Sequence, residues 1–334
     1  MIRTRDKLGF GLVAMTLAAC GAYAADDGAV DRSKLPTPAD VVDKAPQAEW
    51  VEIAPDDLLV MDLPPAATPV GSKPRRVVIQ LMPAPFSQGW VGNIKKLAAA
   101  HWWDGTAIVR VQDNYVTQWG DPNGEDKAKA KPLPKDLVTV PEENYVSARL
   151  QNTMPVGEKT QPAPLFDDLM LANDSYGKAA GFERGWPFAS DGHMIWPLHC
   201  YGAVGVGRNT SPDTGTGAEL YTVIGQAPRQ LDRNIAVVGR VISGMEWLSS
   251  LPRGTGALGF YETPQERTPI RSVRLASELP AASRPRFEYM NTGSKSFADY
   301  AKLRANRHDS FYNVPAGGVD ICNVPVPVRA VKGK

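Results

Sequence analysis

The chain has 334 residues, and its 37 lysines and arginines against 36 aspartates and glutamates give a formal net charge of +1. This balance argues against a general nucleic-acid binder, and an apolar content of 43% is ordinary for a globular chain. The 29 prolines and 30 glycines favour a loop-rich, mainly β fold over a helical bundle. At this length we expect one large domain or two small ones.

The N-terminus has the pattern of a secretion signal. Three basic residues precede an apolar run at 8–19, which is too short for an ordinary membrane span. Two cleavage sites fit. A lipoprotein signal 1–19 would leave a lipidated Cys20 as the first residue, and a signal peptide 1–24 would end after Ala24. Both predict a periplasmic protein, either soluble or anchored to the envelope by lipid.

The elements expected downstream follow the apolar pattern along the chain. Residues 25–47 are rich in Ala, Asp and Pro without a sustained period, which predicts a flexible arm. A domain is expected over 48–276 and a C-terminal extension over 277–334. The predicted strands lie at 50–63, 77–81, 108–111, 192–206, 218–224, 235–241 and 270–275, the helices at 89–100, 244–251 and 296–304, and an extended strap at 319–328.

Residues 123–190 are predicted to be an insertion into this domain. A charged run at 127–131 is followed by Pro132, Pro134 and Pro141, which interrupt regular secondary structure. The pattern predicts a long exposed loop or short elements. We interpret the first part of the insertion as a solvated spacer.

One short strand carries an arginine. In a regular strand, residues two apart share a face, so Ile108, Arg110 and Gln112 are predicted on one face, with Val109 and Val111 on the other. A guanidinium inside an apolar strand is costly to bury without a partner for its donors. Periodicity alone also allows a plain pair between this arginine and a carboxylate at the strand edge.

The residues around this strand resemble the motif of a known family. After the arginine come an aromatic residue, Tyr115, and then Gln118 just before Gly120 and Asp121. This order resembles the core motif of the cyclophilin-type peptidyl-prolyl cis-trans isomerases. Further blocks resemble the same family in the same order, across roughly residues 74–276: a helix at 91–98, a strand at 215–221, and a turn and strand at 231–241.

The resemblance implies a fold and a site. The implied fold is a closed antiparallel β-barrel of eight strands with two covering helices. The implied catalytic residue is Arg110, and Gln118 would hold the carbonyl before the substrate proline. The implied apolar proline pocket consists of Tyr115, Val116, Tyr221 and Leu231.

Four positions depart from the family pattern. Val116 replaces a Met, Gln230 a Trp that lines the pocket, and Ile235 a His, while Glu219 replaces a Gln. An ionised Glu219 can only accept hydrogen bonds, so it would either orient Arg110 or compete with substrate for it.

The implied reaction requires only rotation about an Xaa-Pro bond. A donor placed beside the prolyl nitrogen would stabilise the twisted amide more than either planar form. No nucleophile, metal or cofactor is needed. The expected partners are proline-containing exported polypeptides. The alternative is a cyclophilin-shaped peptide-binding or envelope scaffold protein without catalysis.

The remaining motifs carry weaker signals. An oxidising periplasm would allow a disulfide between Cys200 and Cys322; the alternative is one buried thiol and one thiol in the tail. The glycines at 202–207 lack both the order and the following helix of a nucleotide loop. His193 and His199 have no acidic or Cys neighbours at metal-ligand spacing, so core or surface roles are expected. For Trp102 and Trp103, buried packing is favoured over a ligand platform.

Overall fold

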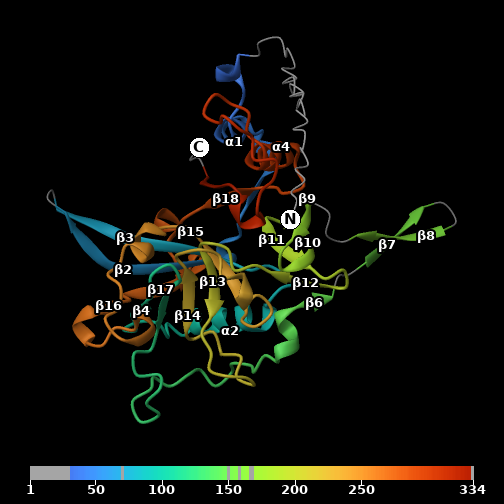
Figure 1. The fold of residues 1–334 in the computed structure, drawn as a ribbon. Coiled ribbons are helices and arrows are strands. Elements are labelled where there is room, and N and C mark those ends of the chain that lie inside the picture. The colour runs from blue at the N-terminus through green and yellow to red at the C-terminus, as the bar shows by residue number, and fades with distance from the viewer. Residues whose placement is uncertain (1–30, 69–70, 149–150, 157–158, 165–168, 332–334) are drawn as a thin grey trace, which may run out of the picture.

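The computed structural model describes residues 31–331 except for 69–70, 149–150, 157–158 and 165–168. At its centre is an antiparallel sheet of nine strands in the order β16-β4-β5-β14-β13-β15-β3-β2-β17, seen in Figure 1. The strands are β2 (Leu58–Thr68), β3 (Gly71–Leu81), β4 (Ala107–Val111), β5 (Val116–Gly120), β13 (Ala203–Val206), β14 (Leu220–Val223), β15 (Val237–Ser243), β16 (Thr268–Pro269) and β17 (Ser272–Leu275).

The sheet curls, but strand pairing does not close it. Its edge strands, β16 and β17, are consecutive pieces of chain that pair with β4 and β2 respectively. Between them the chain crosses from one edge to the other, with Ile270 buried and its backbone N–H donating to Thr106 (2.8 Å). The predicted closed barrel of eight strands is therefore corrected to an open sheet of nine, because this crossing interrupts the ladder.

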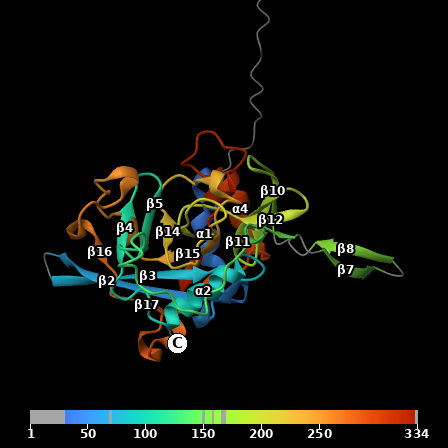
Figure 2. The same cartoon turned by 90° about the horizontal axis from the view of Figure 1, so that it is seen from below.

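Two helices pack on this sheet at the predicted places. Helix α2 (Gln88–Ala99) buries Trp90, Ile94 and Leu97 completely in the main core, and it contacts β15 and β17. Figure 2 shows α2 against the sheet. The short helix α3 (Glu246–Ser249) buries Leu248 in the same core. Each such side chain contributes about 1.5–3 kcal/mol through burial. None of the described helices is long and apolar enough to cross a membrane.

The second half of the insertion folds into a sheet of its own. Five strands lie in the order β6-β12-β11-β10-β9, and a separate hairpin, β7–β8, projects from the body in Figure 1. The predicted loop-rich insertion thus contains β6 (Ser147–Ala148), β7 (Gln151–Val156), β8 (Lys159–Pro164), β9 (Leu169–Asp174), β10 (Gly177–Glu183) and β11 (Trp186–Ser190), followed by β12 (Met194–Pro197). Phe182 and Phe188 are buried, so these strands form because they have a core to cover.

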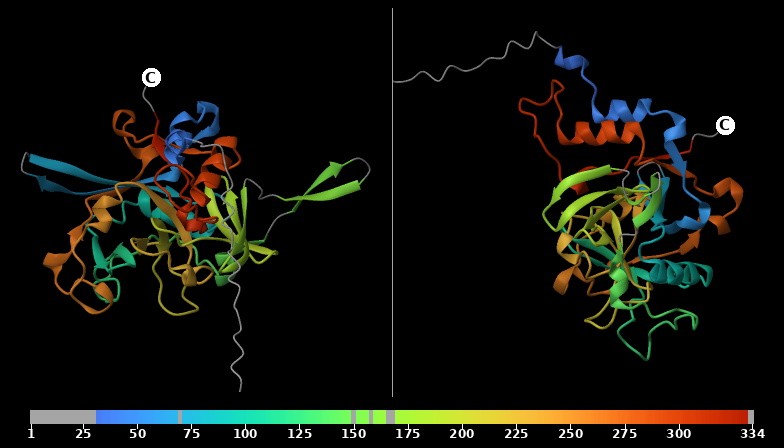
Figure 3. Two further views of the ribbon diagram at one scale, coloured as in Figure 1. Left: turned by 45° about the horizontal axis from the view of Figure 1, so that its top comes forward. Right: turned by 90° about the vertical axis from the view of Figure 1, so that its right-hand side faces the viewer.

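The two ends of the described chain fold together. Strands β1 (Trp50–Glu52), β18 (Phe287–Met290) and β19 (Val328–Ala330) form a sheet. Helix α1 (Pro38–Lys44) packs on α4 (Lys295–Ala305), as Figure 3 shows.

Helix α1 corrects the prediction of a flexible arm for part of residues 25–47; residues 25–30 lie outside the described chain. A capping box starts the helix, since Thr37 Oγ1 accepts from the Asp40 N–H and Asp40 Oδ2 accepts from the Thr37 N–H (2.8 Å).

Candidate active site

A β-bulge turns Arg110 away from the core. Ile108 pairs with Trp119 and Arg110 pairs with Gln118, so Val109 is an extra residue in β4. Ile108 and Val111 are therefore both fully buried in the main core. The prediction that Ile108 and Arg110 share a face was wrong, because one inserted residue shifts the alternation. The bulge leaves Arg110 on the outer surface of the sheet.

Three oxygen acceptors fix the guanidinium of Arg110. Its Nε donates to the Leu258 carbonyl (2.7 Å), Nη1 to Gln118 Oε1 (3.0 Å), and Nη2 to Gln112 Oε1. Burial lowers the pKa of Arg110, although an arginine stays protonated at any physiological pH. A guanidinium has five N–H donors, so these three bonds leave two for another partner.

Two aromatic rings flank the same guanidinium. Its Cζ lies 5.6 Å from the ring centre of Tyr115 and 5.2 Å from that of Phe260. Phe260 is 40% exposed and bridges to Arg110 through the backbone. These rings hold the cation in place and offer apolar surface beside it.

Glu219 is linked to Arg110 through Gln118. The Gln118 side-chain amide donates to Glu219 Oε1 while its carbonyl accepts from Arg110. Burial raises the pKa of Glu219, and Glu125 adds to that effect; the hydrogen bond from Gln118 and the charge of Arg110 oppose it. Glu219 therefore accepts the hydrogen bond that the Gln118 amide could otherwise donate to a ligand, and Gln118 lies between Glu219 and Arg110.

A groove of about 420 Å³ lies at this site. Arg110, Gln118, Glu219 and Phe260 form one part of it. The other walls come from Asp121, from the loop at 207–216 and from the insertion, through Gly124, Glu125, Ala130, Lys131 and Leu133. The first part of the insertion is therefore more than the predicted spacer. Trp102 also lines the groove and is only 5% exposed, whereas Trp103 is fully buried in the core.

The rest of the predicted proline pocket lies elsewhere. Val116 (2% exposed) and Tyr221 (5% exposed) belong to the main core, and Leu231 is partly buried in a 3-10 helix, Arg229–Leu231. None of these three lines the groove, and neither does Tyr115, which is packed partly buried against the main core. Of the positions that depart from the family pattern, Gln230 is exposed and Ile235 is partly buried against the core.

Tyr221 belongs to a buried polar chain that the sequence did not predict. Its hydroxyl lies 2.9 Å from His199 Nε2, and His199 Nδ1 lies 2.9 Å from Asp232 Oδ1. Asp232 also accepts from Arg229, which forms an ion pair with Asp174 of β9 (2.6 Å). Burial raises the pKa of Tyr221 well above its usual value of 10. The chain of contacts through His199, Asp232 and Arg229 thus joins the central sheet to the sheet of the insertion.

The residues that sequence reasoning missed lie in the loop after α3. This loop runs against β4: the N–H of Gly254 donates to Val111 (2.9 Å), and that of Tyr261 to Val109 (3.0 Å). At Gly259, which has φ +80°, a Cβ would come within 2.7 Å of the Gln112 Cα. Only a glycine permits such an approach. The loop has no periodicity, so its glycines were the sole signal available.

The structure contains a disulfide between Cys200 and Cys322, with the Cα atoms 5.1 Å apart. It ties the segment before β13 to the strap near the C-terminus. Cys20 lies outside the described residues.

Comparisons with known proteins agree with this architecture. The family model "Cyclophilin type peptidyl-prolyl cis-trans isomerase/CLD" matches residues 74–275. The cyclophilin AquaCyp293 from Hirschia baltica is similar in fold, with a TM-score of 0.59 and 21% identity over 90% of this chain and 99% of its own. A search of curated proteins found no match.

A structure of the Cryptosporidium parvum cyclophilin type peptidyl-prolyl cis-trans isomerase cgd2_1660, in the presence of the dipeptide Ala-Pro, aligns at 10% identity and a TM-score of 0.35. It covers 65% of this chain and 97% of its own. The family model extends over more than half of the chain and includes the bulged strand with Arg110. The chain therefore belongs to the cyclophilin-type peptidyl-prolyl cis-trans isomerase family.

Proposed function

We propose that this chain accelerates cis–trans isomerisation of Xaa-Pro bonds, with Arg110 as the catalytic residue. One observation carries the proposal: three acceptors and two rings fix the guanidinium in an open groove, with two N–H donors left over. A hydrogen-bond donor that is already oriented stabilises a transition state most where charge or a lone pair develops beside it.

The mechanism follows from the electronic structure of the amide. Its C–N conjugation sets a barrier of about 18–20 kcal/mol to rotation. As the bond twists, the prolyl nitrogen becomes pyramidal and gains a lone pair. An N–H of Arg110 donates to that nitrogen and so stabilises the twisted state more than either planar state. Arginine suits this role because it remains charged and transfers no proton.

The groove also offers groups that grip the substrate. The Gln118 amide is placed to donate to the carbonyl before the proline, once it leaves Glu219. Because Val116 and Tyr221 are buried, we propose that Tyr115 and Phe260 supply the apolar contact with the prolyl ring.

We further propose that the substrates are exported polypeptides and that the protein works in the periplasm. The basic and apolar start of the chain supports export. The Cys200–Cys322 disulfide supports it as well, since disulfides persist in oxidising compartments. Mass spectrometry of the mature N-terminus tests this and distinguishes a lipidated Cys20 from cleavage after Ala24.

A different observation supports a second function, without catalysis. Glu219 holds the Gln118 amide, the group that a catalytic site needs for substrate. This favours a non-catalytic protein that binds peptides or acts as an envelope scaffold.

NMR exchange spectroscopy on a short Xaa-Pro peptide separates the two functions. Catalysis predicts faster exchange with the wild type, lost in Arg110→Ala and retained in Arg253→Ala. Arg253 is a suitable control because its ion pair with Asp113 is exposed. Peptide resonances that shift while exchange stays at its spontaneous rate would identify a binding protein.

A further inference from the structure

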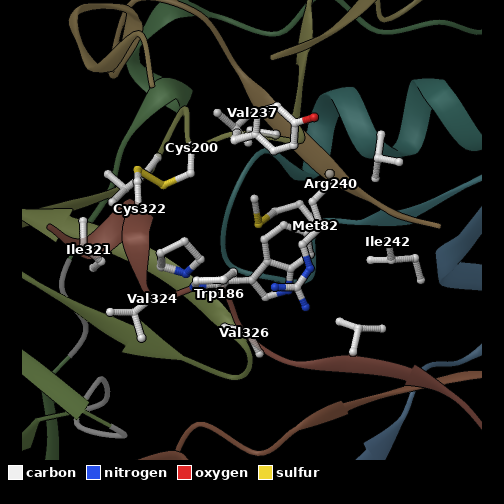
Figure 4. A pocket seen from close by; sticks show the side chains of 18 residues that line it. Met82, Trp186, Cys200, Val237, Arg240, Ile242, Ile321, Cys322, Val324 and Val326 are labelled. Atoms are coloured by element: carbon white, nitrogen blue, oxygen red, sulfur yellow. A yellow bond between two sulfur atoms is a disulfide. The ribbon is translucent and has the colours of Figure 1, made fainter. Parts of the chain in front are cut away.

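A second pocket lies beneath residues 321–328 of the C-terminal strap. Its volume is about 300 Å³, and it shares no lining residue with the groove at Arg110. One side comes from β13 and β15 and the other from the strap, and the cysteines of the disulfide both line it. Figure 4 shows this arrangement. Tyr201 lines the pocket and is 54% exposed, so the pocket reaches the surface.

The pocket contains a cation that has only neutral partners. Arg240 Nε and Nη2 donate to Gln80 Oε1 (3.0 and 2.7 Å), and Nη1 donates to the Gly185 carbonyl (2.7 Å). Among the described residues, no carboxylate forms an ion pair with it. Burial lowers the pKa of Arg240 to about 10, so it remains charged at neutral pH. Arg240 is only partly exposed, and a charge largely withdrawn from water normally has a counter-ion, because desolvation is costly.

Not all N–H groups of Arg240 donate a hydrogen bond within the described structure. Three hydrogen bonds leave two of the five N–H groups of Arg240 for another acceptor. The Arg240 guanidinium lies 4.5 Å from the ring centre of Trp186, which also lines the pocket. The ring of Trp186 is 3% exposed, and it holds the guanidinium in place beside the pocket.

The remaining lining is apolar. Met82, Leu198, Val237, Val324 and Val326 contribute to it, as Figure 4 shows for all of these except Leu198. A volume of about 300 Å³ lies at the lower end of the range for small-molecule sites. The site therefore combines one positive charge, unused N–H donors and an apolar wall of modest size.

We propose that this pocket binds a small aliphatic monocarboxylate. The carboxylate accepts from Arg240, and the hydrocarbon chain lies among the apolar side chains under the strap. The ligand supplies the counter-ion that the described residues do not provide. Such charge-assisted hydrogen bonds are stronger than those between neutral groups, and two N–H groups of a guanidinium can donate in parallel to the two oxygens of a carboxylate.

Isothermal titration calorimetry on the oxidised full-length protein tests this, with octanoate, octanol and octyltrimethylammonium as probes. We expect saturable binding of octanoate at one site per chain. Octanol, which has the same chain without the charge, should bind about 10- to 100-fold more weakly, and the cation should not bind. Equal binding of octanoate and octanol, or no saturable heat at millimolar octanoate, would overturn the proposal.

Two variants assign the binding to this pocket. Arg240→Met keeps an unbranched side chain that is shorter and uncharged, so octanoate affinity should fall to that of octanol. Trp186→Phe leaves a smaller ring against the guanidinium of Arg240 and keeps the charge, so octanoate should bind more weakly. Trp196→Phe is the matched control, because Arg233 lies at the same 4.5 Å from its ring centre but Trp196 lies outside the pocket. Unchanged affinity in Trp186→Phe, or an equal loss in Trp196→Phe, would contradict the assignment.

Discussion

Arg110 Nη1 donates to Gln118 Oε1 across 3.0 Å, between neighbouring strands of the central sheet. This bond orients both groups that a prolyl substrate needs, a guanidinium and a side-chain amide. The same amide donates to Glu219, so the site holds an internal acceptor where substrate would bind. Catalysis therefore depends on how firmly Glu219 retains the amide.

Glu219→Gln should raise both stability and activity at neutral pH. Burial raises the pKa of Glu219, so the folded state binds its proton more tightly than the unfolded state. Wild-type stability therefore falls as pH rises through this raised pKa, and the glutamine avoids that loss. Below the ordinary glutamate pKa of 4.5 the carboxyl is protonated in both states, and the advantage disappears.

Thermal unfolding of wild type and Glu219→Gln between pH 4 and pH 8 measures this difference. A constant difference in melting temperature at all pH values would show that Glu219 titrates normally. In parallel, kcat/KM at neutral pH should increase in the variant, because a glutamine can also donate to the peptide. Unchanged kcat/KM would mean that Glu219 does not compete with substrate.

Phe260→Ala should weaken the fixation of the arginine. The ring lies 5.2 Å from the guanidinium and is 40% exposed, so its removal should cost about 0.5–1 kcal/mol of cation–π stabilisation. We expect kcat/KM to fall several-fold with little loss of stability. Leu258→Ala is the control in the same loop, since the Leu258 side chain is 67% exposed and its hydrogen bond with Arg110 is made by the backbone carbonyl. Equal losses in both variants would attribute the effect to the loop rather than to the ring.

The order of the elements in the central domain and three of the groove's polar residues, Arg110, Gln118 and Glu219, could be predicted, because they depend on local patterns. The strand with Arg110, helix α2 and residues Gln118 and Glu219 lie in segments with clear apolar spacing or a family motif. The bulge at Val109 could not be predicted, since an extra residue leaves no mark on the alternation. Phe260 reaches Arg110 only through folding of a distant loop, and that contact has no local signal.

Asp174→Ala should destabilise the joint between the two sheets. Asp174 pairs with Arg229 at 2.6 Å, and both side chains are about 2% exposed. Its removal leaves a buried guanidinium with Asp232 alone, which should cost about 3 kcal/mol. Urea unfolding measures the loss. Glu52→Ala, which breaks an exposed pair with Arg286, should leave stability almost unchanged. Similar results for the two variants would show that burial does not decide the value of the pair.

The disulfide should be a major source of stability. Cys200 and Cys322 are 122 residues apart, so their link removes much of the freedom of the unfolded chain. The double variant Cys200→Ser with Cys322→Ser should lose about 4 kcal/mol. Urea unfolding with and without reductant tests this, because the reductant should destabilise only the wild type. A wild type that is insensitive to reductant would contradict the expectation.

The central claim is that Arg110 accelerates rotation about the prolyl bond. Its most direct test compares wild type with Arg110→Lys in NMR exchange on a saturating Xaa-Pro peptide. Lysine keeps the charge but loses the fixed fork of donors. We predict that peptide resonances still shift with the variant while the exchange rate falls about 100- to 1,000-fold from the wild-type value, or to the spontaneous rate. Exchange at the wild-type rate in Arg110→Lys would contradict the account.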